Sequence, residues 1–322
     1  MDRNLPLNLA RVTEAAALAS AKFLGRGDKN AADQAAVDAM RRMFDTVNID
    51  GVVVIGEGEM DEAPMLYIGE QIGIAGSNSL KVDIAVDPLD GTNSVAKGLP
   101  NAISVVAIAP RGCLLHAPDT YMNKLAVGPK AKGVVDINKP VEENIYNVAK
   151  ALGKDVSEVT VTIIDRPRHE ELIARVRKAG ARIKLFSDGD VLAAINTCFD
   201  YTGVDILMGI GGAPEGVIAA AAIKCLGGEF QGVLHPVTDE QTRRCLEMGA
   251  DLSKVYTVDD LVKGDEVVFA ATGVSHGELL QGVKFLEKDL ATTHTLVLRA
   301  ETGTIRFIES IHKLDKKPEY AK

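Results

Sequence analysis

The sequence predicts an α/β protein, an α+β layered sandwich in which helix and sheet layers alternate in two lobes. Strands and helices alternate between residues 159 and 226, which is typical of α/β layers. The chain has 322 residues, 46% of them hydrophobic, enough to bury the core of one large domain or two lobes. A polar, strand-poor stretch at 128–154 predicts the lobe boundary, so we expect lobes at 1–150 and 151–322.

Two helices open the chain. Apolar residues at helical spacing predict one helix between Leu9 and Phe23 and another that begins near Asn30. Apolar runs then predict strands at 52–55, 82–87 and 102–109. We expect the strand at 82–87 to end at Asp87, because Pro88 cannot donate a hydrogen bond in a central strand.

The second half repeats a strand–helix rhythm. Strands are predicted at 159–164, 182–186 and 205–208, and helices at 170–179, 191–198 and 217–226. A hairpin is predicted from strands 295–299 and 304–308, and a solvated tail at 316–322.

Composition argues against several classes of partner. The formal net charge is −9, and no extended Lys/Arg run offsets it, so we expect neither a nucleic-acid nor a membrane partner. No stretch approaches the roughly 20 apolar residues of a transmembrane helix. The four cysteines lie far apart, without zinc-ligand spacing, and are expected to be reduced thiols. Together these features predict a cytoplasmic protein.

Acidic residues gather at predicted strand ends. Asp87 ends a strand, Asp90 returns to the same point, and Gly91-Thr92 opens a predicted helix. Two carboxylates beside backbone N–H groups suit a hard cation such as Mn²⁺ or Mg²⁺ and a phosphate. The alternative is a plain strand-turn with a capping aspartate, but we favour the metal site.

Three further acids lie in related positions. Asp33 lies on the apolar face of its helix, where an ion pair with Lys29 and a metal site are equally good explanations. Glu57 directly follows a buried strand, between glycines. Glu215 follows Gly209–Pro214 at a predicted helix start. A glutamate is also common in the first turn of a helix for purely structural reasons.

The motif at 87–92 resembles that of the lithium-sensitive phosphatase superfamily. The match narrows to class II fructose-1,6-bisphosphatases through segments spread over nearly the whole chain and in the family's order. These segments are 27–33, 56–59, 166–168, 187–190, 209–215 and 292–294. One departure is visible, because Asp90 stands where some class members have Glu.

The resemblance implies a sugar-phosphatase fold, a cytoplasmic homo-oligomer (dimer or tetramer) and a small sugar bisphosphate as substrate. It implies Mn²⁺ or Mg²⁺ ligands at Asp33, Glu57, Asp87, Asp90 and Glu215. It implies substrate contacts at Asp90, Gly91, Thr92, Tyr121, Arg166, Pro167, Arg168, Asp188, Gly189, Asp190 and Gly212. Thr92 and Asp61 are the expected catalytic residues.

The expected reaction is hydrolysis of the 1-phosphate of fructose-1,6-bisphosphate by a metal-activated water. Sedoheptulose-1,7-bisphosphate is the nearest alternative substrate, and an inositol monophosphatase-like activity comes next. The alternative from another class is a phosphometabolite-binding protein that has kept the fold and lost the chemistry.

Overall fold

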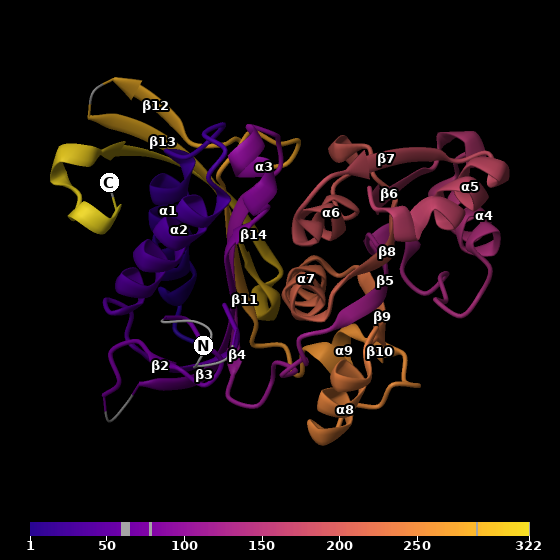
Figure 1. Ribbon diagram of the computed structural model, residues 1–322, viewed down its shortest axis with the longest axis horizontal. Helices are drawn as coiled ribbons and strands as arrows, with labels where there is room; N and C mark the ends of the chain where they lie inside the picture. The colour runs from indigo at the N-terminus through magenta and orange to yellow at the C-terminus, as the bar shows by residue number, and fades with distance from the viewer. Residues whose placement is uncertain (59–64, 77–78, 288, 322) are drawn as a thin grey trace. The chain divides into compact units, whose positions relative to one another are not determined.

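The computed structural model describes residues 1–58, 65–76, 79–287 and 289–321 (Figure 1). The chain divides into two compact units, which are Met1–Leu115 with Gly264–Lys322, and His116–Lys263. In each unit helices pack on a mixed sheet, so the α/β prediction is confirmed. Within the described ranges no helix is long and apolar enough to cross a membrane.

The sheet of the first unit has the strand order β12-β13-β11-β4-β3-β1-β2, and β14 also pairs with β13. Its strands are β1 (Ile49–Ile55), β2 (Gln71–Ile72), β3 (Leu80–Asp90), β4 (Ile103–Pro110), β11 (Val268–Gly273), β12 (Lys284–Glu287), β13 (Leu290–Arg299) and β14 (Thr304–Lys313). The helices α1 (Leu5–Ala21) and α2 (Lys29–Phe44) pack on this sheet and bury Leu9, Met40 and Phe44 with it. The two opening helices and the hairpin of β13 and β14 are therefore confirmed.

The lobe boundary expected between residues 150 and 151 falls inside helix α4 (Val141–Leu152). The chain divides elsewhere because β11 pairs with β4 along six residue pairs, which returns the C-terminal segment to the first sheet. The end of the chain also differs from the solvated tail that we expected. Tyr320 packs against α1 and α2, and the Arg42 guanidinium lies 5.8 Å from the centre of its ring.

Strand β3 is longer than the sequence predicted. It continues through Pro88 to Asp90 in the interior of the sheet, between β1 and β4. Asp87 pairs with Val105 and Asp90 with Ile103, so Pro88 and Leu89 of β3 lie opposite a single residue of β4, Ser104. This bulge accommodates Pro88, because the extra residue leaves the regular hydrogen-bond ladder.

The sheet of the second unit has the strand order β10-β9-β5-β8-β6-β7. Its strands are β5 (Tyr121–Val127), β6 (Thr160–Ile164), β7 (Arg182–Phe186), β8 (Ile206–Gly212), β9 (Glu229–His235) and β10 (Tyr256–Thr257). Its helices are α4, α5 (Glu170–Ala179), α6 (Asp190–Asn196), α7 (Ala213–Leu226), α8 (Asp239–Glu247) and α9 (Val258–Leu261). The predicted alternation over 159–226 is confirmed, whereas α4, α8, α9, β5, β9 and β10 were missed.

Helices cover both faces of this second sheet, with α4 and α5 on one side and α6 and α7 on the other (Figure 1). Leu125 and Met208 point into a core with Ile145 of α4 and Val176 of α5. Residues of β5 alternate between the two faces, so Met122 and Lys124 lie on the side of α7.

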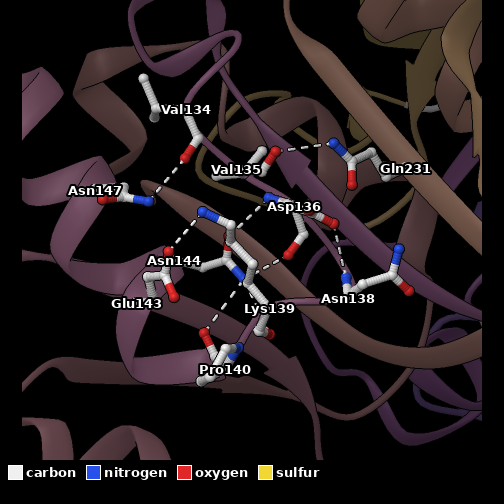
Figure 2. Close-up of polar contacts among 10 residues, drawn as sticks. All are labelled: Val134, Val135, Asp136, Asn138, Lys139, Pro140, Glu143, Asn144, Asn147 and Gln231. Atoms are coloured by element: carbon white, nitrogen blue, oxygen red, sulfur yellow. Dashed lines mark hydrogen bonds and ion pairs between the residues drawn. The ribbon is translucent and has the colours of Figure 1, made fainter.

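The stretch at 128–154 is polar because its backbone is held by side chains (Figure 2). The buried Asn144 of α4 accepts from the Asp136 amide and donates to the Asp136 carbonyl, each at 2.8 Å. Asn147 donates to the Val134 carbonyl at 3.1 Å. Gln231 of β9 donates to the Val135 carbonyl at 3.0 Å. Buried backbone groups need such partners, so this segment belongs to the second unit and is not a linker.

Candidate active site

Three of the four acids predicted as metal ligands in the first unit lie at the carboxyl ends of neighbouring strands. β1 and β3 are parallel, so their carboxyl ends reach the same edge of the sheet. Glu57 follows the end of β1 by two residues, and Asp87 and Asp90 form the end of β3. The strand pairing therefore brings these three positions to one edge.

The bulge at Pro88 shapes this edge. Asp87 Oδ1 accepts a hydrogen bond from the Leu89 amide at 3.0 Å, which closes the local turn. Asp90 is only 4% exposed. Gly91 has φ +107°, and a Cβ on it would lie 3.1 Å from Ala102 Cα, so glycine is required there. Helix α3 (Thr92–Lys97) then starts at Thr92, as the sequence predicted.

Asp33 lies in the second turn of α2, a helix that packs against α3. The loop before α2 is tied to α3, because Gly25 donates to the Val95 carbonyl at 2.8 Å and Gly27 to the Ala96 carbonyl at 2.9 Å. Burial raises the pKa of the Asp33 carboxyl, and the charge of Lys29 opposes that shift. A half-buried carboxylate with a raised pKa is one that a nearby cation would stabilise.

The predicted substrate contacts of the second unit lie at one edge of its sheet. The strands β6, β7 and β8 are parallel, and Arg166–Arg168, Asp188–Asp190 and Gly212–Glu215 follow or end them in turn. β5 runs antiparallel to β8, so its first residue, Tyr121, lies opposite Gly212. Ligands of open α/β sheets bind at such carboxyl ends.

Contacts within the unit hold the side chains of Arg166 and Arg168 at this edge. Arg168 donates to the Ile210 carbonyl through Nε at 3.1 Å and Nη2 at 2.7 Å. Its guanidinium carbon lies 4.9 Å from the centre of the Tyr121 ring. Arg166 Nη2 lies 3.7 Å from Asp188 Oδ1. Arg168 also lines a pocket of about 460 Å³, a size that suits a small phosphorylated molecule.

His169 is a buried clamp that the sequence analysis missed. Its Nδ1 lies 2.8 Å from the Ile164 carbonyl oxygen, and its Nε2 accepts from the Ile210 amide at 2.8 Å. The ring therefore ties the end of β6 to the end of β8. A Cβ on Gly209 would lie 3.1 Å from Nε2, which explains a glycine at that position.

A buried charge cluster lies beside this clamp. Lys124 Nζ is 2.6 Å from Asp190 Oδ2, with side chains 2% and 10% exposed. Burial raises the pKa of Glu215, the nearby Lys124 charge opposes this shift, and the Asp190 charge adds to it. Among the described residues, Asp190 Oδ1 and Glu215 Oε2 are buried without a hydrogen-bond partner. The sequence analysis did not single out Lys124, although a lysine among the apolar residues of a strand was a visible signal.

The glycines at 209–212 make room for these side chains. A Cβ on Gly211 would lie 1.9 Å from Asp190 Oδ2, and one on Gly212 would lie 1.8 Å from Glu215 Oε2. Both separations are far shorter than van der Waals contact allows. The glycine-rich segment is therefore explained by close side-chain packing and needs no nucleotide-binding role.

The family follows from the match along the chain. The protein-family model described as "Bacterial fructose-1,6-bisphosphatase, glpX-encoded" matches residues 3–312 of this chain. The chain belongs to this family. The resemblance that we inferred from the motifs is thereby confirmed.

Curated relatives carry the corresponding names. The chain is 51% identical to "Fructose-1,6-bisphosphatase 1 class 2" of Escherichia coli K12, over 98% of this chain and 97% of the relative. The same values hold for "Fructose-1,6-bisphosphatase class 2" of Escherichia coli O6:H1 and of Shigella flexneri. Among solved structures, the extragenic suppressor from Pyrococcus furiosus matches at 14% identity over 55% of this chain and 63% of that chain, with a TM-score of 0.27.

The donor chemistry of the site fits a hard divalent cation. Carboxylate oxygens are the ligands that Mn²⁺ and Mg²⁺ prefer, and a buried carboxylate oxygen such as Glu215 Oε2 needs a cation or a donor. In the described ranges, no three His, Cys, Asp or Glu side chains are already grouped closely enough to hold a metal ion. Asp61, the second expected catalytic residue, lies outside the described residues.

Proposed function

We propose that this chain hydrolyses the 1-phosphate of fructose-1,6-bisphosphate to fructose-6-phosphate and phosphate, a step of gluconeogenesis. The observation that carries the proposal is the family match over residues 3–312, together with 51% identity to relatives named class 2 fructose-1,6-bisphosphatases. The chain is thus a hydrolase of phosphoric monoesters that acts in carbohydrate metabolism.

The metal ligands proposed are Asp33, Glu57, Asp87, Asp90 and Glu215. Bound Mn²⁺ or Mg²⁺ supplies Lewis-acid chemistry and a water of lowered pKa. The backbone N–H groups of Gly91 and Thr92, at the start of α3, hold the scissile phosphate in the proposed mechanism. The Thr92 hydroxyl, with Asp61, orients the attacking water for in-line displacement.

The second unit supplies substrate choice in this proposal. Arg166, Arg168 and Tyr121 bind the distal phosphate. Arg168 uses one N–H of Nε and one of Nη2 on the Ile210 carbonyl, and its remaining N–H groups are available to an anion. Asp188–Asp190 and Gly212, with Pro167 shaping the arginine loop, face the sugar. We therefore assign metal binding mainly to the first unit and substrate recognition to the second.

Phosphate release by the purified protein tests this assignment. Fructose-1,6-bisphosphate is compared with sedoheptulose-1,7-bisphosphate and inositol-1-phosphate, each with Mn²⁺, Mg²⁺ or EDTA. Metal-dependent turnover that favours the fructose substrate is expected. A preference for sedoheptulose-1,7-bisphosphate or inositol-1-phosphate would reassign the pocket, and no turnover with any metal would favour the phosphometabolite-binding alternative.

Two variants test the catalytic roles proposed for residues at the end of β3 and the start of α3. Asp87→Ala and Thr92→Ala are expected to lose turnover while the far-ultraviolet circular dichroism spectrum stays that of the wild type. Retained activity in either folded variant would count against the mechanism, because Asp87 is a proposed metal ligand and the Thr92 hydroxyl is proposed to orient the attacking water.

We also propose a cytoplasmic homo-oligomer, a dimer or a tetramer. On the molecule itself, support comes from Ile305, Phe307 and Ile311, which lie on one face of β14 and are 44%, 42% and 75% exposed. Glu309 lies between Phe307 and Ile311 on the same face. Exposed apolar side chains of this size on one face of a strand suit contact with a second copy of the chain. Light scattering coupled to size-exclusion chromatography tests this, and a monomer at micromolar concentration would refute it.

A further inference from the structure

Lys124 occupies a place where a charged side chain is costly. It lies in the middle of β5, its side chain is 2% exposed, and its Nζ lies 2.6 Å from Asp190 Oδ2. Taking two charges out of water costs free energy that their attraction only partly offsets, so a buried ion pair is weak evidence for a purely stabilising role.

The fold reserves space for this pair. A Cβ on Gly211 of β8 would lie 1.9 Å from Asp190 Oδ2 and 3.2 Å from Lys124 Nζ. A Cβ on Gly216 of α7 would lie 3.4 Å from Lys124 Cε. The ion pair therefore lies directly on the backbone of Gly211, where any side chain would displace it.

The pair leaves one acceptor unused. Lys124 holds Oδ2 of Asp190, whereas Oδ1 is buried and has no hydrogen-bond partner in the described part of the chain. The geometry fixes the rotation of the carboxylate, because one oxygen is tied to the lysine. The other oxygen then has a defined direction in which it can accept a hydrogen bond, and a sugar hydroxyl is a donor of the right kind.

We propose that Lys124 is a positioning residue of the active site, which holds Asp190 so that its second carboxylate oxygen accepts a hydrogen bond from a sugar hydroxyl. This rests on the proposed function, since it takes Asp190 as a contact of the sugar phosphate. Gly211 contributes to this positioning because the absence of a side chain leaves room for the Lys124–Asp190 ion pair. Lys124 itself does not touch the reacting atoms.

The test perturbs the pair from both sides. Lys124→Met removes the charge and keeps the length of the side chain, and Gly211→Ala keeps the charges and displaces them. Lys224→Met is the matched control, since Lys224 pairs with Asp259 at 2.5 Å in the same unit, on α7. For each protein we would measure KM and kcat with fructose-1,6-bisphosphate, binding of fructose-6-phosphate by calorimetry, and the thermal unfolding midpoint.

Both site variants are expected to raise KM and weaken fructose-6-phosphate binding by about tenfold or more, the usual loss for a hydrogen bond to a charged group. The kcat at saturating substrate and saturating Mn²⁺ or Mg²⁺ should stay within about threefold; saturating metal is needed because the Lys124 charge also acts on Glu215, a proposed metal ligand. Lys224→Met should change neither KM nor product binding. A merely structural lysine would not give this split between KM and kcat.

A folded Lys124→Met or Gly211→Ala variant with KM and product affinity within about twofold of the wild type would overturn the inference. Where Lys124→Met does not fold, Gly211→Ala carries the test. Absence of turnover in the wild type would overturn the proposed function instead. The ratio of the fructose-6-phosphate affinities of wild type and variant, measured by calorimetry, would still test the role of Lys124.

Discussion

Replacing His169 by phenylalanine tests whether this ring clamps the ends of β6 and β8. His169 is 2% exposed and makes two hydrogen bonds of 2.8 Å, one with the Ile164 carbonyl and one with the Ile210 amide. Phenylalanine keeps a ring but leaves both backbone groups without partners. Each unsatisfied buried group costs about 1–3 kcal/mol, so the free energy of unfolding should fall by about 2–6 kcal/mol.

The assay is thermal unfolding of the whole protein, followed by circular dichroism between pH 5 and pH 8. For a unit of this size each kcal/mol corresponds to about 2–4 °C, so the midpoint should fall by at least about 4 °C at pH 8. His235→Phe is the control, since His235 is an exposed histidine at the end of β9 in the same unit.

The pH dependence gives a second test. Burial lowers the pKa of His169, the bond to the Ile164 carbonyl opposes this shift, and the charges of Arg168 and Arg166 add to it. A lowered pKa in the folded state contributes stability above the unfolded value of about 6.5, and that stability is lost as the pH falls through the folded value. The difference between wild type and His169→Phe should therefore shrink toward acid pH. A loss below about 2 °C at pH 8, or a difference independent of pH, would refute the clamp.

Three further predictions concern other parts of the molecule. Gly212→Ala should lower kcat/KM by about 100-fold, because its Cβ would lie 1.8 Å from Glu215 Oε2 and a 1 Å misplacement costs about that much; activity within threefold would contradict this. Asn144→Ala should lower the free energy of unfolding in urea by about 2–3 kcal/mol, because the Asp136 amide and carbonyl lose their partner; a change below 0.5 kcal/mol would contradict the network in Figure 2. His312, whose pKa burial lowers to about 4, should titrate near that value by NMR, and titration near 6.5 would contradict its burial.

Local patterns were enough to predict several elements. Residues 170–179 and 182–186 were predicted as a helix and a strand, and α5 and β7 have these bounds. Gly180 explains part of this success, because its φ of +90° ends α5 in a conformation that glycine favours. The acids and arginines at strand ends were also visible, because a strand end and its following loop lie within one short segment.

Elements with polar residues on a buried face were missed. β5 carries Asn123 and Lys124 in its middle, which breaks the apolar alternation that marks a strand. The lysine is tolerated only because Asp190, 66 positions away in sequence, meets it in the folded unit. No local pattern contains that information.

The sequence by itself determined the family, the α/β class and the presence of acids and arginines at the strand ends. Each of these can be recognised within short segments of the chain. Only the tertiary structure decided that the C-terminal strands return to the first sheet and that Pro88 lies in a bulge within β3. It alone revealed that His169, Lys124 and the glycines at 209–212 hold one edge of the second sheet. These features depend on pairing between distant strands, whose partners are chosen by the packing of the whole unit.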